Sequence, residues 1–198
     1  MTGFVQTGLR LARLLAAPHL EGWQAKGDPM DPSREMGEAT REGVEQGSGE
    51  AAPRLGPEHQ RLEVFIGGWT AEGVLGEAAG PQARVKATAV DRYEWLPGGF
   101  FLSCRGVMRF AGESLESTRI IGFDPERQRY RMHLFDNHGY ARVYEGGERD
   151  GIWTFAGAHE RVTMSFEDGN QRLDIRWEQS DDGATWRPLC DLKATRVH

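Results

Sequence analysis

The sequence has few of the features that disulfide scaffolds, metal centres and membrane spans require. Its 198 residues include two cysteines, Cys104 and Cys190, whose separation fits no metal-ligand spacing. They are expected to be small buried residues in a reducing compartment, with a disulfide between them as the less favoured alternative. No apolar run approaches the roughly 20 residues of a membrane-spanning helix. These features predict a cytoplasmic protein without an integral membrane segment.

Positive charge is also in the minority. The chain carries 24 lysines and arginines against 30 aspartates and glutamates, for a net charge of −6 and an isoelectric point near 5.6. Nucleic-acid binding usually requires a basic surface, so no nucleic-acid partner is expected. The mean hydropathy of −0.59 is low for a globular chain and indicates that one segment adds little to a core.

Residues 1–57 are predicted to be an N-terminal extension. Residues 1–17 place apolar side chains at roughly helical spacing, which predicts a short amphipathic helix. Because Arg10 and Arg13 lie inside this stretch, a signal peptide is not favoured; an unpacked tail and a membrane-surface helix are the alternatives. Residues 18–57 contain five prolines and few apolar residues, which is typical of a disordered linker.

A short helical turn precedes the first predicted strand. Residues 58–66 place Leu62 and Phe65 on one face, since residues three apart are neighbours on a helix. Gly67-Gly68 ends the turn, and Trp69 opens the strand. This segment is predicted to close one end of a β structure.

The rest of the chain reads as strands joined by short turns. Residues 84–96 and 100–110 alternate apolar and polar side chains, as half-buried antiparallel strands do. Val90 and Asp91 interrupt the first pattern and predict a bulge, and residues 146–151 are predicted to be a connection. In total, about ten strands follow the helical turn, and no longer helix is expected after it.

This succession of hairpins predicts an all-β domain over residues 58–198. An open sheet of about ten strands would leave two exposed edges, and closing it into a barrel removes them. The predicted fold is therefore a single antiparallel up-and-down barrel. A β-sandwich is the alternative, but it usually needs a long crossover connection, which the sequence does not offer.

Four local patterns, in this order and spacing, resemble those of the bacterial family named domain of unknown function 1579. The patterns are the helical turn with Gly-Gly-Trp at 61–69, Pro-Gly-Gly-Phe-Phe-Leu at 97–102, Ile-Gly-Phe-Asp at 121–124 and Ser-Asp-Asp-Gly-Ala-Thr-Trp at 180–186. The resemblance covers residues 58–198 and implies a calycin-like, lipocalin-like barrel. It also implies that Arg196 on the last strand covers Trp69 and closes the barrel end. The family has no established activity.

Residues that could carry catalysis or bind a cofactor are sparse. No two histidines have the spacing of a metal site, and no serine follows a glycine elbow, so no catalytic residue or metal is predicted. His133, on a predicted strand, is the most informative histidine. A likeness to nitrobindin-like barrels raises haem as a cofactor, with His133 or His159 as its ligand. Otherwise no cofactor is expected.

A barrel of about ten strands is wider than side chains readily fill, so a cavity is expected. The candidate ligand-binding residues are aromatic or basic and lie on strands: Tyr93, Trp95, Arg105, Arg119, His133 and Tyr144. An arginine that faces inward would favour an anionic or polar-headed ligand.

Three functions follow from this interpretation of the sequence. The favoured one is binding of an apolar or amphipathic small molecule, without catalysis, by a monomer or homodimer. The second is an enzyme of unknown reaction with a polar lumen around His133. The third is a protein-interaction module that uses the outer face of the barrel.

Overall fold

The structure is a computed structural model that describes residues 53–79 and 84–197. The helix predicted for residues 1–17 and most of the predicted linker lie outside the described residues. In the described part, no helix is long and apolar enough to span a membrane.

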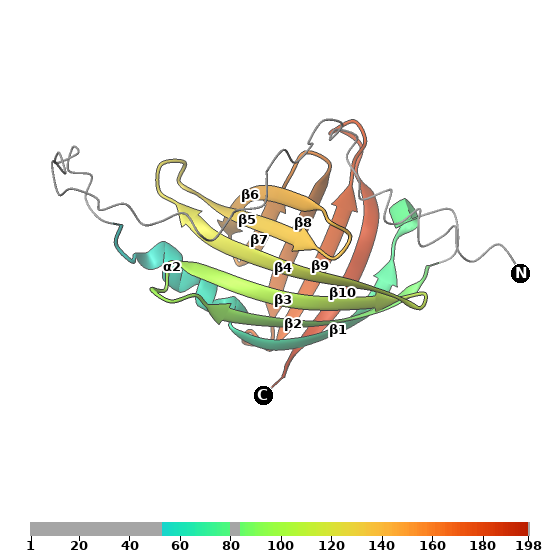
Figure 1. The fold of residues 1–198 in the computed structure, drawn as a ribbon, viewed down its shortest axis with the longest axis horizontal. Coiled ribbons are helices and arrows are strands. Elements are labelled where there is room, and N and C mark those ends of the chain that lie inside the picture. Colours follow the sequence, from blue (N-terminus) through green and yellow to red (C-terminus); the bar gives the residue numbers. More distant parts are fainter. Residues whose placement is uncertain (1–52, 80–83, 198) are drawn as a thin grey trace, which may run out of the picture. The chain divides into compact units, whose positions relative to one another are not determined.

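Ten strands form one closed barrel (Figure 1). They are β1 (Gly67–Leu75), β2 (Lys86–Trp95), β3 (Phe101–Phe110), β4 (Glu113–Asp124), β5 (Arg129–Asp136), β6 (Ala141–Arg149), β7 (Ile152–Ala156), β8 (Glu160–Glu167), β9 (Arg172–Gln179) and β10 (Arg187–Val197). Each strand pairs antiparallel with the next in sequence, and β10 pairs with β1 to close the sheet. The predicted up-and-down barrel is confirmed, and the sandwich alternative is wrong.

A helical cap closes one end of the barrel. It consists of α2 (Pro57–Arg61) and the 3₁₀ turn η1 (Leu62–Phe65), and a second 3₁₀ turn, η2 (Glu77–Ala79), follows β1. Leu62 and Phe65 are fully buried. The Phe65 ring packs edge-on against Trp153 and Phe166, with ring centroids 5.1 and 5.0 Å away. These aromatic side chains fill the cap half of the interior, since rings of this size bury large apolar surfaces.

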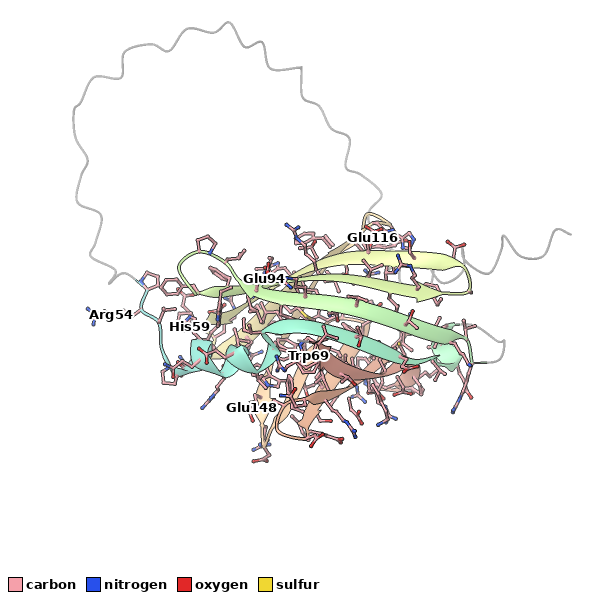
Figure 2. All side chains as sticks on the ribbon, turned by 90° about the horizontal axis from the view of Figure 1, so that it is seen from below. Arg54, His59, Trp69, Glu94, Glu116 and Glu148 are labelled. Carbon is pink, nitrogen blue, oxygen red and sulfur yellow. The ribbon has the colours of Figure 1, made fainter. Side chains whose placement is uncertain are left out.

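Arg196 and Trp69 lie together beside the cap, as the family resemblance implies. The Trp69 indole N–H donates to the Phe65 carbonyl at 2.8 Å, which places this ring next to η1 (Figure 2). The guanidinium carbon of Arg196 lies 4.3 Å from the Trp69 ring centroid. The Arg196 guanidinium also donates to the carbonyls of Ile66 and Val64. One side chain of the last strand thus holds the chain between the cap and the first strand.

Removing this side chain is expected to loosen the cap. Arg196→Ala should lower the free energy of unfolding by about 2 kcal/mol, because it removes hydrogen bonds to backbone carbonyls and a cation–π contact. Arg196→Lys should recover little, since an ammonium cannot reproduce the planar fork. Urea unfolding measures the change. Arg172→Ala, which removes an exposed arginine of β9, is the control, and equal losses in both alanine variants would contradict this role for Arg196.

Two local predictions are wrong. The pairing of β2 with both neighbours runs without a shift through Val90 and Asp91, so no bulge lies there, and the bulge in the sheet lies in β10 between Pro188 and Cys190. Asp91 follows the alternation of β2 and faces the interior, where it pairs with Arg119. Gly146, predicted to lie in a connection, continues β6 and pairs with Phe155 of β7.

Candidate functional site

The interior of the barrel holds a cavity of about 130 Å³. Its apolar wall includes Met108, Leu115, Met132, Leu134, Met164 and Trp177. Its ionisable and hydroxyl groups come from Asp91, Tyr93, Ser117, Arg119, Asp136, Arg142, Tyr144, Glu160 and Cys190. Leu75 and Leu189, at the ends of β1 and β10 away from the helical cap, also line it. The cavity therefore occupies the half of the barrel that the aromatic residues under the cap leave open.

Asp91 and Arg119 form an ion pair in the cavity wall. Their side chains are only 15% and 12% exposed, and the Arg119 Nη2 atom donates to the Asp91 carboxylate. Gly106 lies between the two residues across β3, since it pairs with Asp91 on one side. A Cβ on Gly106 would overlap the Asp91 carboxylate and lie 2.6 Å from Arg119 Nη2. The glycine therefore makes the space that this ion pair occupies.

Tyr93 completes this part of the wall, and the buried Cys104 is its pairing partner on β3. Arg119 Nη1 donates to the Tyr93 hydroxyl at a long 3.4 Å. Burial raises the pKa of Tyr93, and the Arg119 charge opposes this only in part. Burial likewise raises the pKa of the Cys104 thiol to about 12. Burial alone would lower the pKa of Arg119, but the Asp91 charge, the hydrogen bond to Asp91 and smaller contributions from Cys104 and Tyr93 together raise the pKa above its ordinary value. Tyr93 and Cys104 are therefore uncharged at neutral pH, and the Asp91 carboxylate balances the positive charge of Arg119.

A second polar group lies on β6, β8 and the end of β5. The Tyr144 hydroxyl donates to Glu160 Oε2 at 2.6 Å. Arg142 Nη1 lies 3.1 Å from Asp136 Oδ2, and Arg142 Nε lies 3.6 Å from Glu160 Oε2. Burial raises the pKa of Glu160, while the Tyr144 hydrogen bond and the Arg142 charge lower it only in part. Burial and then Glu160 raise the pKa of Tyr144.

The raised pKa of Glu160 makes its effect on stability depend on pH. The carboxyl is protonated in both folded and unfolded chains below its ordinary value of 4.5, and its ionisation opposes folding as the pH rises through the higher folded-state pKa. As the pH rises from about 4.5 to the folded-state pKa, the wild type should therefore lose stability relative to Glu160→Gln. Urea unfolding of both chains measures the difference. Glu72→Gln on the outer face of β1 is the control, and a pH-independent difference at Glu160 would contradict the assignment.

The structure brings together three of the six residues predicted to bind a ligand. Tyr93, Arg119 and Tyr144 all line the cavity. Trp95 continues the inward-facing row of β2, but it packs at the cap end of the core and does not line the cavity.

Arg105 and His133 lie on the outer face, so their predicted places in the lumen are wrong. Arg105 is exposed and borders a hollow of about 520 Å³ on the outer surface of β2–β5. His133 pairs with Ile120 and Val143, between the inward-facing Met132 and Leu134. The polar lumen around His133 that the second function requires is therefore contradicted by the structure. The alternation along a strand assigns successive residues to opposite faces, but it does not say which face is inside.

The two histidines named as haem ligands are not placed to serve in the cavity. His133 faces outward, and His159 is exposed with its Nδ1 atom 3.3 Å from the Ser180 carbonyl. Among the described residues, no histidine lines the cavity. Nor does that part of the chain contain a cluster of three metal-ligating side chains.

Sequence reasoning missed all three acidic side chains of the cavity. Asp91 was taken as a break in the pattern, and Asp136 and Glu160 lie at the ends of β5 and β8, next to turns. One signal was available for Asp91. This residue keeps the alternation of the apolar residues of β2, as an inward-facing residue does. In the sequence, Arg142 is a mid-strand arginine without a distinguishing pattern. Only the register of β5 and β6 shows that it faces inward.

The fold and the cavity define a closed antiparallel β-barrel with an amphipathic lumen. Residues 54–182 match the family described as "Protein of unknown function (DUF1579)". Because the match spans well over half of the chain, the protein belongs to this family. No curated protein matches the chain.

Two solved structures are similar to this barrel. Rv2717c from M. tuberculosis has 14% sequence identity and a TM-score of 0.54, and the match covers 73% of this chain and 100% of that one. The S-type phycobiliprotein lyase CPES from Guillardia theta has 9% identity and a TM-score of 0.52, covering 70% and 92%. At these identities the likeness shows a shared fold alone.

Proposed function

We propose that this protein binds a small amphipathic molecule in the lumen of its barrel. The observation that carries the proposal is the composition of the cavity, where thioether and aliphatic side chains surround a few buried polar groups. Ligand sites have this composition, because apolar walls supply affinity and a few polar groups fix orientation. A fully packed barrel would have no need of buried ion pairs, which are costly to desolvate.

The size of the cavity restricts the ligand. An apolar protein cavity of about 150 Å³ holds one benzene molecule. The 130 Å³ space here is similar, so the bound part of the ligand is about as large as one six-membered ring. A longer molecule would place only one end in the lumen.

The cysteines support an intracellular setting for this function. Cys104 and Cys190 are both buried free thiols, so the disulfide alternative is wrong. Free thiols persist in reducing compartments. We therefore place the proposed binding protein in the cytoplasm.

Filling the cavity should abolish ligand binding. Ala89 lines the lumen, whereas Thr88, the preceding residue of β2, is exposed on the outer face. Protein isolated from its native host should release a small molecule on denaturation, detected by mass spectrometry. Ala89→Phe should release none, because the ring occupies the space, and the matched Thr88→Phe should release as much as the wild type. Equal release from both variants would contradict a lumen site.

A further inference from the structure

The Arg119 guanidinium has hydrogen-bonding capacity that the protein does not use. An arginine side chain carries five N–H hydrogens. Within residues 53–79 and 84–197, Arg119 makes two side-chain hydrogen bonds, one to Asp91 and a long one to Tyr93. Its Nε atom is buried and has no hydrogen-bond partner there. Leaving buried donors unsatisfied is costly, so an acceptor that enters the cavity beside this group would be stabilised.

The two arginines of the cavity differ in this respect. Leu134 of β5 pairs with Arg119 on one side and Arg142 on the other, so it separates the two guanidinium groups along the wall. Arg142 contacts two carboxylates, those of Asp136 and Glu160. Arg119 contacts one, that of Asp91. The capacity for a further acceptor therefore lies at Arg119.

The charge of the cavity disfavours an anion. Three carboxyl groups line it, those of Asp91, Asp136 and Glu160, against two guanidinium groups. No lysine or histidine among the described residues adds a further positive charge to the lining. A ligand carboxylate would bring another negative charge into a buried space that already holds a surplus of acidic groups, and burying an unbalanced charge is expensive.

From these observations we infer that the ligand is uncharged and presents an oxygen acceptor, such as a ketone carbonyl, to Arg119. Its remainder is an apolar body of about ring size that packs against Met108, Leu115 and Leu134. This inference rests on the proposed function and names the ligand class of the same cavity. It replaces the expectation that an inward arginine selects an anion, because Asp91 already balances the charge of that arginine.

Three probes of similar size test the inference on the wild-type protein by titration calorimetry. Cyclohexanone and methylenecyclohexane differ only in the replacement of the carbonyl oxygen by a methylene group, and cyclopentanecarboxylate carries a negative charge. Cyclohexanone should bind about tenfold or more tightly than methylenecyclohexane, as a hydrogen bond to a charged donor provides. Cyclopentanecarboxylate should bind least.

Two variants locate the preference. The double variant Asp91→Asn, Arg119→Met removes both charges of the ion pair. It should bind the ketone and the alkene equally. Arg105→Met removes an exposed arginine of the neighbouring strand and should keep the wild-type preference. If the double variant does not fold, the wild-type titrations still decide whether the cavity prefers the carbonyl oxygen to a methylene group.

Equal binding of the ketone and the alkene by the wild type would overturn the inference while leaving lumen binding intact. Tightest binding of the carboxylate would overturn it as well. Failure of all three probes to bind would contradict the proposed function, and this inference with it.

Discussion

Replacing Arg119 by methionine is expected to destabilise the barrel by about 3–5 kcal/mol, because it leaves Asp91 as a buried charge without its partner. Asp91 is 15% exposed and its carboxylate accepts a hydrogen bond from Arg119. The variant should unfold at a clearly lower urea concentration with a similar slope. The loss comes from the carboxylate that remains and not from the apolar side chain that is introduced.

A double-mutant cycle separates these two causes. Adding Asp91→Asn to Arg119→Met should recover most of the stability, since no buried charge then remains. Arg105→Met removes an exposed arginine of β3 and should change stability by no more than about 0.5 kcal/mol. The ion-pair assignment fails if Arg119→Met resembles Arg105→Met, or if the double variant is no more stable than Arg119→Met alone.

The second large effect is expected at Gly146. This residue faces inward on β6, and a Cβ there would overlap the backbone carbonyl oxygen of Thr154 and lie 2.8 Å from the Phe155 Cα. Backbone atoms of a paired strand cannot move aside as a flexible side chain can. Gly146→Ala should therefore push β6 and β7 apart and cost about 3 kcal/mol, at the upper end of the range for overpacking.

The adjacent glycine provides a matched control. Gly147 lies in the same strand and faces the other way, with nothing within 4 Å of the position of an added Cβ. Gly147→Ala should leave the free energy of unfolding nearly unchanged, within about 0.5 kcal/mol. Equal urea midpoints for the two alanine variants would show that β7 does not approach Gly146 as closely as the structure has it.

The architecture was predictable because it follows from local patterns. Alternation along residues 84–96 and 100–110, with short turns between strands, was enough to favour a closed sheet over a β-sandwich. The helical cap followed from the spacing of Leu62 and Phe65, both of which are fully buried. The contact between Arg196 and Trp69 came from the family resemblance, because two residues so distant in sequence give no local signal.

The site was only partly predictable, because it depends on which side of each strand faces inward. Tyr93, Arg119 and Tyr144 line the cavity, but His133, which was named with them, faces outward, and the alternation of β5 fits either choice. Asp91 looked like an irregularity because a carboxylate is unexpected on a buried face. Its partner lies two strands away, and only the pairing of β2, β3 and β4 brings the two together.

The central claim is that a small molecule occupies the lumen, and three methionines report on it directly. Met108, Met132 and Met164 all line the cavity, and they are the only methionines among the described residues. Cyclohexanone added to protein with isotope-labelled methionine methyl groups should shift these three NMR signals in a saturable way. Ala89→Phe should abolish the shifts. If the three signals stay unchanged at saturating cyclohexanone while other parts of the spectrum move, the ligand binds elsewhere and the account is wrong.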